Sequence, residues 1–166
     1  MMHEFNQIEL HKENMKFSAG HFTIFSATER ENLHGHNYSV HGVFVTAKSD
    51  NGLSFDYRFY KDKLRELCSR LDEFVIIPTL SKHLIISETD QYVNVIFNHE
   101  EMRFLKRDVI LLPIKNSTVE ELSDWFLKEL IKDESHLVTN NITQIQIKIL
   151  SAPGQSGSSI WSQAHE

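Results

Sequence analysis

The sequence has very few cysteines and prolines: one cysteine, Cys68, and three prolines in 166 residues. A single cysteine excludes a disulfide within the chain and fits a reducing compartment. No apolar run approaches the roughly 20 residues of a membrane span. The first ten residues, MMHEFNQIEL, lack the basic and apolar regions of a signal peptide. We therefore expect a cytoplasmic protein that does not enter a membrane.

Positive charge is not in excess either. The chain has 17 lysines and arginines against 23 acidic residues, which gives a formal net charge of −6. The excess of positive charge that is typical of a nucleic-acid-binding protein is therefore missing. No repeat and no Pro/Gly-rich linker interrupts the sequence. We expect residues 1–166 to form a single domain, long enough to bury a core without disulfides.

The spacing of apolar residues predicts an α+β fold. We expect long strands over residues 8–25 and 34–47, and a short strand at 53–57 that pairs back through the turn KSDNGL. Helices are expected at 59–71 and from 117 or 118 to about 132. The remaining expected elements are a hairpin at 91–104, strands at 109–114 and 142–150, and an irregular tail. This order predicts a mainly antiparallel sheet with both helices packed on one face.

The stretch LHGHNY places His34 and His36 on either side of Gly35. Residues i and i+2 of a strand project from the same face, so the two imidazoles are expected close enough to share a metal ion. An open catalytic zinc site needs a third ligand. His21, on the preceding strand, is the best candidate. The alternative is that His34 and His36 are ordinary hydrogen-bonded loop histidines, because HxH alone is a weak signal.

Four segments in order extend this pattern over nearly the whole chain. They are FSAGH (17–21), LHGHNY (33–38), LD (71–72) at the end of the first helix and NSTVEEL (116–122) at the start of the second. Together they resemble the 6-pyruvoyl-tetrahydropterin synthase family, which includes the bacterial 6-carboxytetrahydropterin synthases of queuosine biosynthesis. The resemblance supports His21, His34 and His36 as ligands of Zn2+.

The resemblance implies the tunnelling fold, an antiparallel sheet with two helices on one face that assembles into an oligomeric barrel. The expected partners are a small pterin and further copies of the chain, as a trimer or hexamer with active sites at subunit boundaries. The implied activity is that of a zinc-dependent lyase acting on 7,8-dihydroneopterin triphosphate. In the reaction that the resemblance implies, zinc would bind the hydroxyls of the substrate side chain, a base would move protons, triphosphate would be eliminated, and the side chain would be rearranged or cleaved.

This sequence differs from the family's pattern at the position of the catalytic base. Most members of the family carry a cysteine four residues before the first histidine of HGH, where this chain has Arg30. Cys68 lies on the apolar stripe of the first helix and is predicted to be a core residue. Glu31 instead forms E-x-x-H-G-H, which resembles a subgroup that yields 6-hydroxymethyl-7,8-dihydropterin for folate synthesis. A carboxylate near zinc is a plausible general base; the alternative is a solvated loop residue.

Two further departures concern proton transfer and pterin binding. The family's Leu-Asp-His is Leu-Asp-Glu here, so Asp72 is kept and Glu73 replaces a histidine of reference pKa about two units higher. We expect both to assist proton transfer, unless Glu73 is merely exposed at a helix end. The glutamate that anchors the pterin ring in the family aligns with Ser151. A hydroxyl lacks the charge and bidentate geometry of a carboxylate.

Thr118 and Glu120 match family residues near the pterin pocket. They also fit helix capping, as Ser117 with Glu120 or Thr118 with Glu121. The sequence thus predicts a zinc-dependent lyase that gives 6-hydroxymethyl-7,8-dihydropterin or 6-pyruvoyl-tetrahydropterin. The alternatives are a 6-carboxytetrahydropterin synthase, a divergent member with another substrate, and a protein with only a binding role.

Overall fold

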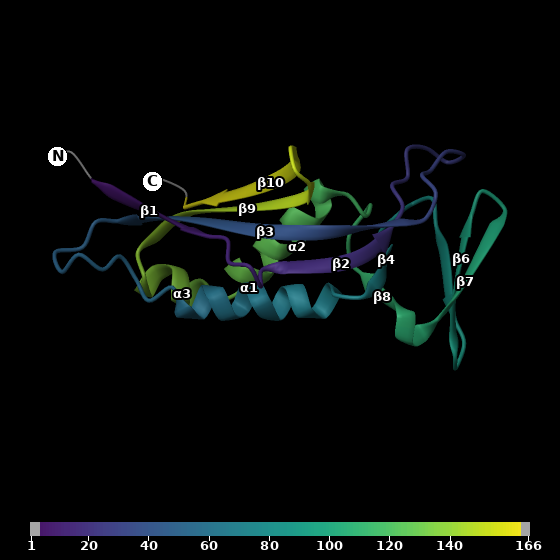
Figure 1. Cartoon of the computed structure of the whole chain (residues 1–166), viewed down its shortest axis with the longest axis horizontal. Helices are drawn as coiled ribbons and strands as arrows, with labels where there is room; N and C mark the ends of the chain where they lie inside the picture. The colour runs from purple at the N-terminus through teal and green to yellow at the C-terminus, as the bar shows by residue number, and fades with distance from the viewer. Residues whose placement is uncertain (1–3, 164–166) are drawn as a thin grey trace.

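The computed structural model describes residues 4–163 and has helices and strands in a mixed order (Figure 1). The strands are β1 (Phe5–Leu10), β2 (Lys16–His21), β3 (His34–Ala47), β4 (Phe74–Pro78), β5 (Ile85–Glu88), β6 (Tyr92–Phe97), β7 (Glu100–Leu105), β8 (Val109–Leu112), β9 (Ile142–Ala152) and β10 (Gln155–Ser162). The helices are α1 (Arg58–Leu71), α2 (Val119–Ile131), α3 (Glu134–Thr139) and the 3-10 turn η1 (Lys106–Asp108). None of the helices in this part of the chain has the length and apolar character of a membrane span.

The largest sheet is built around β3. Its seven strands follow the order β10-β9-β3-β2-β4-β8, and β1 pairs with the second half of β3. β3 pairs antiparallel with β1, β2 and β9, whereas β4 runs parallel to both β2 and β8. The expected antiparallel centre is confirmed, and the sheet as a whole is mixed.

The strand expected over residues 8–25 is wrong as a single element. β1 and β2 are separated by residues 11–15, which bulge out opposite only two residues of β3, because the register jumps from Leu10↔Gly42 to Lys16↔Ser39. The less exposed side chains of β1 lie at even positions and end at the buried Leu10, whereas the buried side chains after the bulge lie at odd positions from Met15 to His21. The bulge therefore lets both strands bury their apolar residues on the same side.

Two other expectations are wrong. Residues 53–57 are not a strand: Ser49 and Asn51 hydrogen-bond to the backbone of Leu53, and the chain then enters α1. The tail is not irregular, since β10 pairs with β9 along its whole length. Gly157 permits this, because a Cβ there would lie 2.9 Å from the backbone nitrogen of Glu120. The strands β4 and β5 were not predicted.

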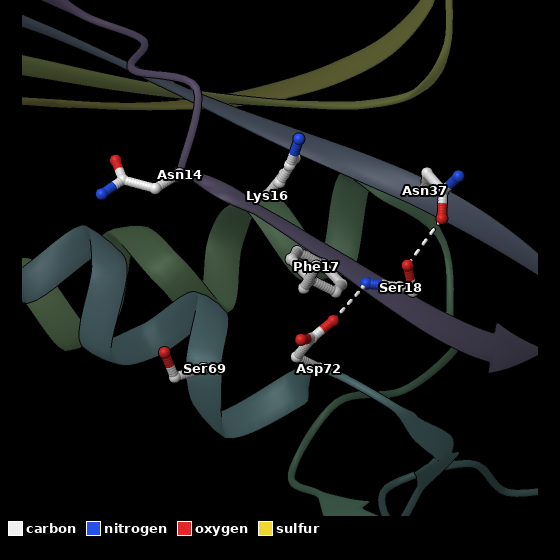
Figure 2. A pocket seen from close by; sticks show the side chains of 7 residues that line it. All are labelled: Asn14, Lys16, Phe17, Ser18, Asn37, Ser69 and Asp72. Atoms are coloured by element: carbon white, nitrogen blue, oxygen red, sulfur yellow. Dashed lines mark hydrogen bonds between the residues drawn. The ribbon is translucent and has the colours of Figure 1, made fainter.

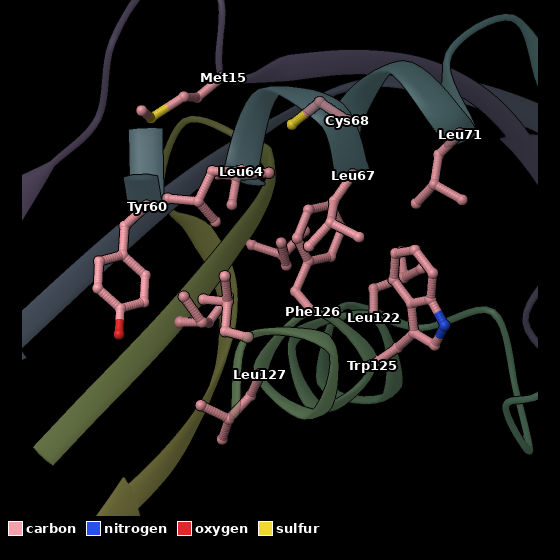
Figure 3. Close-up of a cluster of buried hydrophobic side chains, with 14 of the residues drawn as sticks. Met15, Tyr60, Leu64, Leu67, Cys68, Leu71, Leu122, Trp125, Phe126 and Leu127 are labelled. Atoms are coloured by element: carbon pink, nitrogen blue, oxygen red, sulfur yellow. The ribbon is translucent and has the colours of Figure 1, made fainter. Parts of the chain in front are cut away.

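Both long helices cover the same face of the large sheet, as expected. Their apolar residues meet in one buried cluster with those of β2, β3 and β9 (Figure 3). Tyr60, Leu64 and Leu67 recur at helical spacing along α1 and are fully buried. Cys68 belongs to this stripe at 1% exposure, and burial raises the pKa of its thiol to about 12. Its predicted core role is confirmed.

A second, smaller sheet of β5, β6 and β7 lies beside the large one (Figure 1). It has its own buried cluster, in which Val95 and Phe97 of β6 pack with Ile77 of β4. Phe22 and Ile24, from the segment just after β2, belong to the same cluster. The loop between β2 and β3 is therefore anchored on the small sheet.

Candidate metal centre and its neighbouring carboxylates

Three histidines meet at the ends of β2 and β3. The register pairs His21 with His34, and His36 follows on the same face of β3. One ligand nitrogen from each ring lies within 4.8 Å of the other two, and the Nε2 atoms of His34 and His36 are 3.1 Å apart. The structure thus brings together the three residues predicted as ligands.

Backbone carbonyls orient two of these rings. Nδ1 of His21 lies 2.7 Å from the carbonyl oxygen of Ser117, and Nδ1 of His34 lies 2.7 Å from that of Asn32. In a neutral imidazole the nitrogen facing a carbonyl carries the proton, so Nε2 keeps its lone pair. A carbonyl on the far nitrogen is a common outer support of metal-binding histidines.

The burial of the three rings is graded. His21 is 6% exposed, His36 is half-buried and His34 is exposed. Burial lowers the pKa of His21; the carbonyl of Ser117 opposes this shift, and the charges of His34 and His36 add to it. Its Nε2 is buried and has no hydrogen-bond partner among residues 4–163. A neutral, unpartnered nitrogen beside two other imidazoles fits a metal ion.

Glu31 lies in the loop that connects β2 to β3. One carboxylate oxygen accepts a 2.9 Å hydrogen bond from the backbone N–H of Thr23, and the N–H of Glu31 donates to the Thr23 carbonyl at 2.8 Å. Burial raises the pKa of Glu31, but the hydrogen bonds from Thr23 and the charges of His21 and His34 outweigh it, so the pKa is lowered. The carboxylate is therefore ionised at neutral pH and close enough to interact with two of the three histidines.

Asp72 and Glu73 lie at the junction of α1 and β4. Asp72 accepts a 2.7 Å hydrogen bond from the Ser18 N–H and lines a hollow of about 490 Å³ (Figure 2). Glu73 and His36 line a neighbouring hollow of about 370 Å³, and the two hollows share Ser18 and Asn37. Glu73 has a φ of 66°, in the left-handed region, and its N–H donates to the Ser18 carbonyl at 2.7 Å.

The two residues expected near a pterin pocket lie at the start of α2. Thr118 is the N-cap, and its hydroxyl accepts the N–H of Glu121 at 3.4 Å. Glu120 is exposed. The capping box expected from Ser117 and Glu120 is wrong, because the Ser117 hydroxyl donates instead to the carbonyl of Phe22 at 2.8 Å. That bond ties the start of α2 to the residue after His21.

Ser151 lies near the end of β9 and is 8% exposed. Its hydroxyl is buried, and the structure gives it no hydrogen-bond partner within the described chain. A buried, unsatisfied hydroxyl costs about 1–3 kcal/mol. The position expected to anchor a pterin ring thus holds a neutral group whose hydrogen bonds are unused.

Several supporting groups could not be identified from residue types. The carbonyls of Ser117 and Asn32 and the N–H of Thr23 are backbone groups, which every residue carries. Asn116 was identifiable only as part of NSTVEEL. Its side chain accepts from the N–H of Ile24 at 3.1 Å and donates to the carbonyl of the same residue at 2.8 Å, which holds the loop after His21.

Comparison with known proteins gives a consistent set of relatives. The chain is 28% identical over 156 residues to a putative 6-carboxy-5,6,7,8-tetrahydropterin synthase of Methanocaldococcus jannaschii, covering 93% of each. A solved 6-pyruvoyl tetrahydropterin synthase of Plasmodium falciparum is 30% identical with a TM-score of 0.90, covering 96% of this chain and 99% of that one.

The enzyme of Plasmodium vivax is similar to the same degree. Two of its structures, 28% identical with a TM-score of 0.90 over 96% of this chain and 99% of those chains, carry cysteine or alanine in place of a glutamate described as a catalytic residue. A family model described as 6-pyruvoyl tetrahydropterin synthase matches residues 9–157. The chain therefore belongs to the 6-pyruvoyl tetrahydropterin synthase family.

Proposed function

We propose that this protein is a zinc-dependent lyase that acts on the side chain of 7,8-dihydroneopterin triphosphate. The proposal rests on one observation: three imidazoles lie together at the ends of β2 and β3, and the loop that connects these strands carries the ionised carboxylate of Glu31. Family membership supports a tetrahydropterin synthase type of reaction. The substrate, the metal and the residue roles are our inferences.

His21, His34 and His36 would hold the zinc ion. Bound there, zinc would supply Lewis acidity that polarises the hydroxyls of the substrate side chain. The graded burial supports this assignment, because a buried ligand, His21, at one end and an exposed ligand, His34, at the other leave the open side facing solvent. Substrate would approach from that side.

Glu31 would act as the general base. It replaces the family's cysteine in function but stands one position later, beside Arg30. The hydrogen bond from Thr23 occupies one carboxylate oxygen and restrains the side chain, so the other oxygen can accept a proton. The glutamate described as catalytic in the P. vivax protein supports a carboxylate in this role.

Glu73 would return or relay a proton with help from Asp72. Glu73 lines the same hollow as His36, whereas Asp72 holds the junction in place through the Ser18 N–H. The strained backbone of Glu73 supports a functional role, because left-handed non-glycine residues are enriched at active sites. Thr118 and Glu120 would contact the pterin, and the product would be 6-hydroxymethyl-7,8-dihydropterin or 6-pyruvoyl-tetrahydropterin.

A 6-carboxytetrahydropterin synthase is the second candidate. Its support is the printed name of the M. jannaschii relative, whose sequence aligns with 93% of this chain. Ser151 favours a third possibility, a pterin-like substrate whose ring does not need a carboxylate anchor. We also expect a homo-oligomer, as a trimer or hexamer, which light scattering after gel filtration will test.

The deciding experiment is incubation of the zinc-loaded protein with 7,8-dihydroneopterin triphosphate. We expect triphosphate release, and mass spectrometry of the pterin fraction will distinguish the hydroxymethyl, pyruvoyl and carboxy products. Absence of release with stoichiometric zinc bound would refute the proposed substrate. Calorimetry with a dihydropterin would then separate a different substrate from a purely binding role.

A further inference from the structure

Arg30 is held by four neighbours on three parts of the chain. Its guanidinium carbon lies 5.1 Å from the ring centre of Phe22 and 5.7 Å from that of Phe97 on β6. One terminal nitrogen donates to the Glu31 carbonyl at 2.7 Å, and the other lies 3.7 Å from a carboxylate oxygen of Glu100 on β7. The side chain is only 17% exposed, and its Nε is buried without a hydrogen-bond partner among residues 4–163, so these contacts replace only part of its hydration.

These contacts connect the metal centre to the small sheet. Phe22 directly follows the deepest histidine, His21, and Glu31 directly follows Arg30 in the chain. Phe22 and Phe97 both belong to the buried cluster under β5, β6 and β7. One guanidinium therefore touches the residue after a candidate ligand, the backbone of the candidate base, and the sheet beneath both.

Arg30 restrains Glu31 without neutralising it. The hydrogen bond goes to the carbonyl oxygen of Glu31, while the carboxylate receives its bond from Thr23. A direct Arg–carboxylate pair would hold the carboxylate ionised and occupy its acceptor sites. Contact with the carbonyl leaves the carboxylate free and limits only how the loop can move.

We propose that Arg30 is a positioning residue that holds the loop carrying Glu31 against the small sheet and so fixes the orientation of the Glu31 carboxylate. This inference rests on the proposed function. It also gives the small sheet a role, because β6 and β7 supply the Phe97 ring and the Glu100 carboxylate that hold the guanidinium.

The same small sheet offers a matched control. The guanidinium carbon of Arg103 on β7 lies 4.0 Å from the ring centre of Tyr92, but its side chain is exposed and lies three residues along β7 from Glu100. Arg103→Met removes an arginine–aromatic contact from the same sheet without touching the loop. Arg30→Met keeps the apolar stem and removes the charge and donors, and Arg30→Lys keeps the charge and one donor group.

The test compares zinc-loaded wild type, Arg30→Met, Arg30→Lys and Arg103→Met with 7,8-dihydroneopterin triphosphate as substrate. For Arg30→Met we expect kcat to fall roughly 10- to 100-fold, since small misplacements of a catalytic group have effects of that size. KM and zinc content should stay near wild type. Arg30→Lys should recover part of the loss, and Arg103→Met should match wild type.

Amide hydrogen exchange provides the readout that does not depend on activity. The N–H groups of Thr23 and Glu31 are hydrogen-bonded within the loop, so loosening it should speed their exchange at least about tenfold in Arg30→Met and less in Arg30→Lys. Unchanged exchange, or a raised KM with unchanged kcat, would overturn the proposal. If the wild type releases no triphosphate, the proposed function fails, and exchange alone decides whether Arg30 holds the loop. Should Arg30→Met fail to fold, the lysine variant carries the same comparison.

Discussion

The backbone N–H of Thr23 points at the carboxylate of Glu31 across a 2.9 Å hydrogen bond. Thr23 stands two residues after His21, so the same short segment that carries a candidate metal ligand also orients the candidate base. The bond lowers the pKa of Glu31 against the raising effect of burial, which keeps the carboxylate ionised at neutral pH. A carboxylate in this state can accept a proton from a bound substrate.

Glu31→Gln should abolish most of the activity and keep the metal. The amide has nearly the same shape, and its oxygen can still accept the Thr23 N–H, but it cannot take up a proton. We expect the rate of triphosphate release to fall about 10²- to 10⁴-fold, the usual range for loss of a general base. Steady-state assays and zinc analysis measure both quantities.

Glu29→Gln is the matched control for this change. Glu29 lies in the same loop and its side chain is exposed, while its backbone carbonyl accepts the N–H of Phe25 at 2.9 Å and that of Ser26 at 3.1 Å. Its substitution should leave activity within about twofold of wild type, as is usual for an exposed side chain. Full activity in Glu31→Gln would remove Glu31 from the mechanism.

His34→Ala should lose stoichiometric zinc, because two imidazoles alone make a weak and incomplete site. Metal that binds only the folded state also stabilises it, by about 4 kcal/mol at a free concentration 1,000 times Kd. We therefore expect chelation to lower Tm in the wild type and to have little effect on His34→Ala. Equilibrium dialysis and calorimetry measure binding and Tm. His83→Ala, a histidine outside the cluster, should behave like wild type in both.

Much of the fold could be predicted where one rule acts over a long segment. β3 has the predicted bounds, since apolar residues alternate along it and turn residues flank it. The same alternation predicted that His34 and His36 share a face. α2 was predicted to within two residues because Thr118 supplies a cap before a regular apolar stripe.

The errors arose where tertiary contacts override local pattern. β10 has four serines and one glycine among its eight residues and few of the β-branched and aromatic residues that favour strands, so it forms because β9 and the start of α2 provide its partners. The break between β1 and β2 depends on a register shift against β3, which only the pairing reveals. The link from Thr23 to Glu31 was not predictable, since it joins a backbone group to a loop side chain eight residues away.

Glu73→Gly should stabilise the protein and impair the reaction. A left-handed φ of 66° costs a non-glycine residue roughly 1 kcal/mol, which glycine avoids. In a chain of this length that corresponds to a rise in Tm of about 2–4 °C. Calorimetry should detect the rise, and activity should fall if Glu73 moves a proton.

His99→Gly separates the effect of backbone strain on Tm from the effect of the Glu73 carboxylate on activity. His99 has the same φ of 66° but lies in the turn between β6 and β7, outside the hollows lined by Asp72 and Glu73. Because glycine keeps this φ and leaves the neighbouring Glu100 in place, the variant should gain a similar Tm and keep its activity. Glu73→Gln, which keeps the strain and removes the carboxylate, should lose activity without stabilisation. Equal activity in wild type and Glu73→Gln would show that the carboxylate at this position is not needed.

His41 should make stability depend on mildly acidic pH. It lies on β3 directly opposite Lys148 of β9, and its ring centre is 4.8 Å from that of His11. Burial lowers the pKa of His41, and the charges of His11 and Lys148 lower it further, while Glu9 opposes them. In the unfolded chain a histidine has a pKa of about 6.5. Just below that pH, His41 is therefore protonated in the unfolded chain but still mostly neutral in the folded protein. Its stabilising effect is present above that pH and is lost as the pH falls toward the lowered value.

We expect His41→Gln to flatten this dependence, because glutamine does not titrate. Urea unfolding of metal-free wild type and His41→Gln at pH 5 and pH 7.5 measures the difference, since the other histidines are common to both proteins. The wild type should lose more unfolding free energy between the two pH values than the variant. If the variant loses as much unfolding free energy as the wild type, His41 accepts its proton in the folded protein as readily as in the unfolded chain. His11 or Lys148 would then have to move away from the His41 ring.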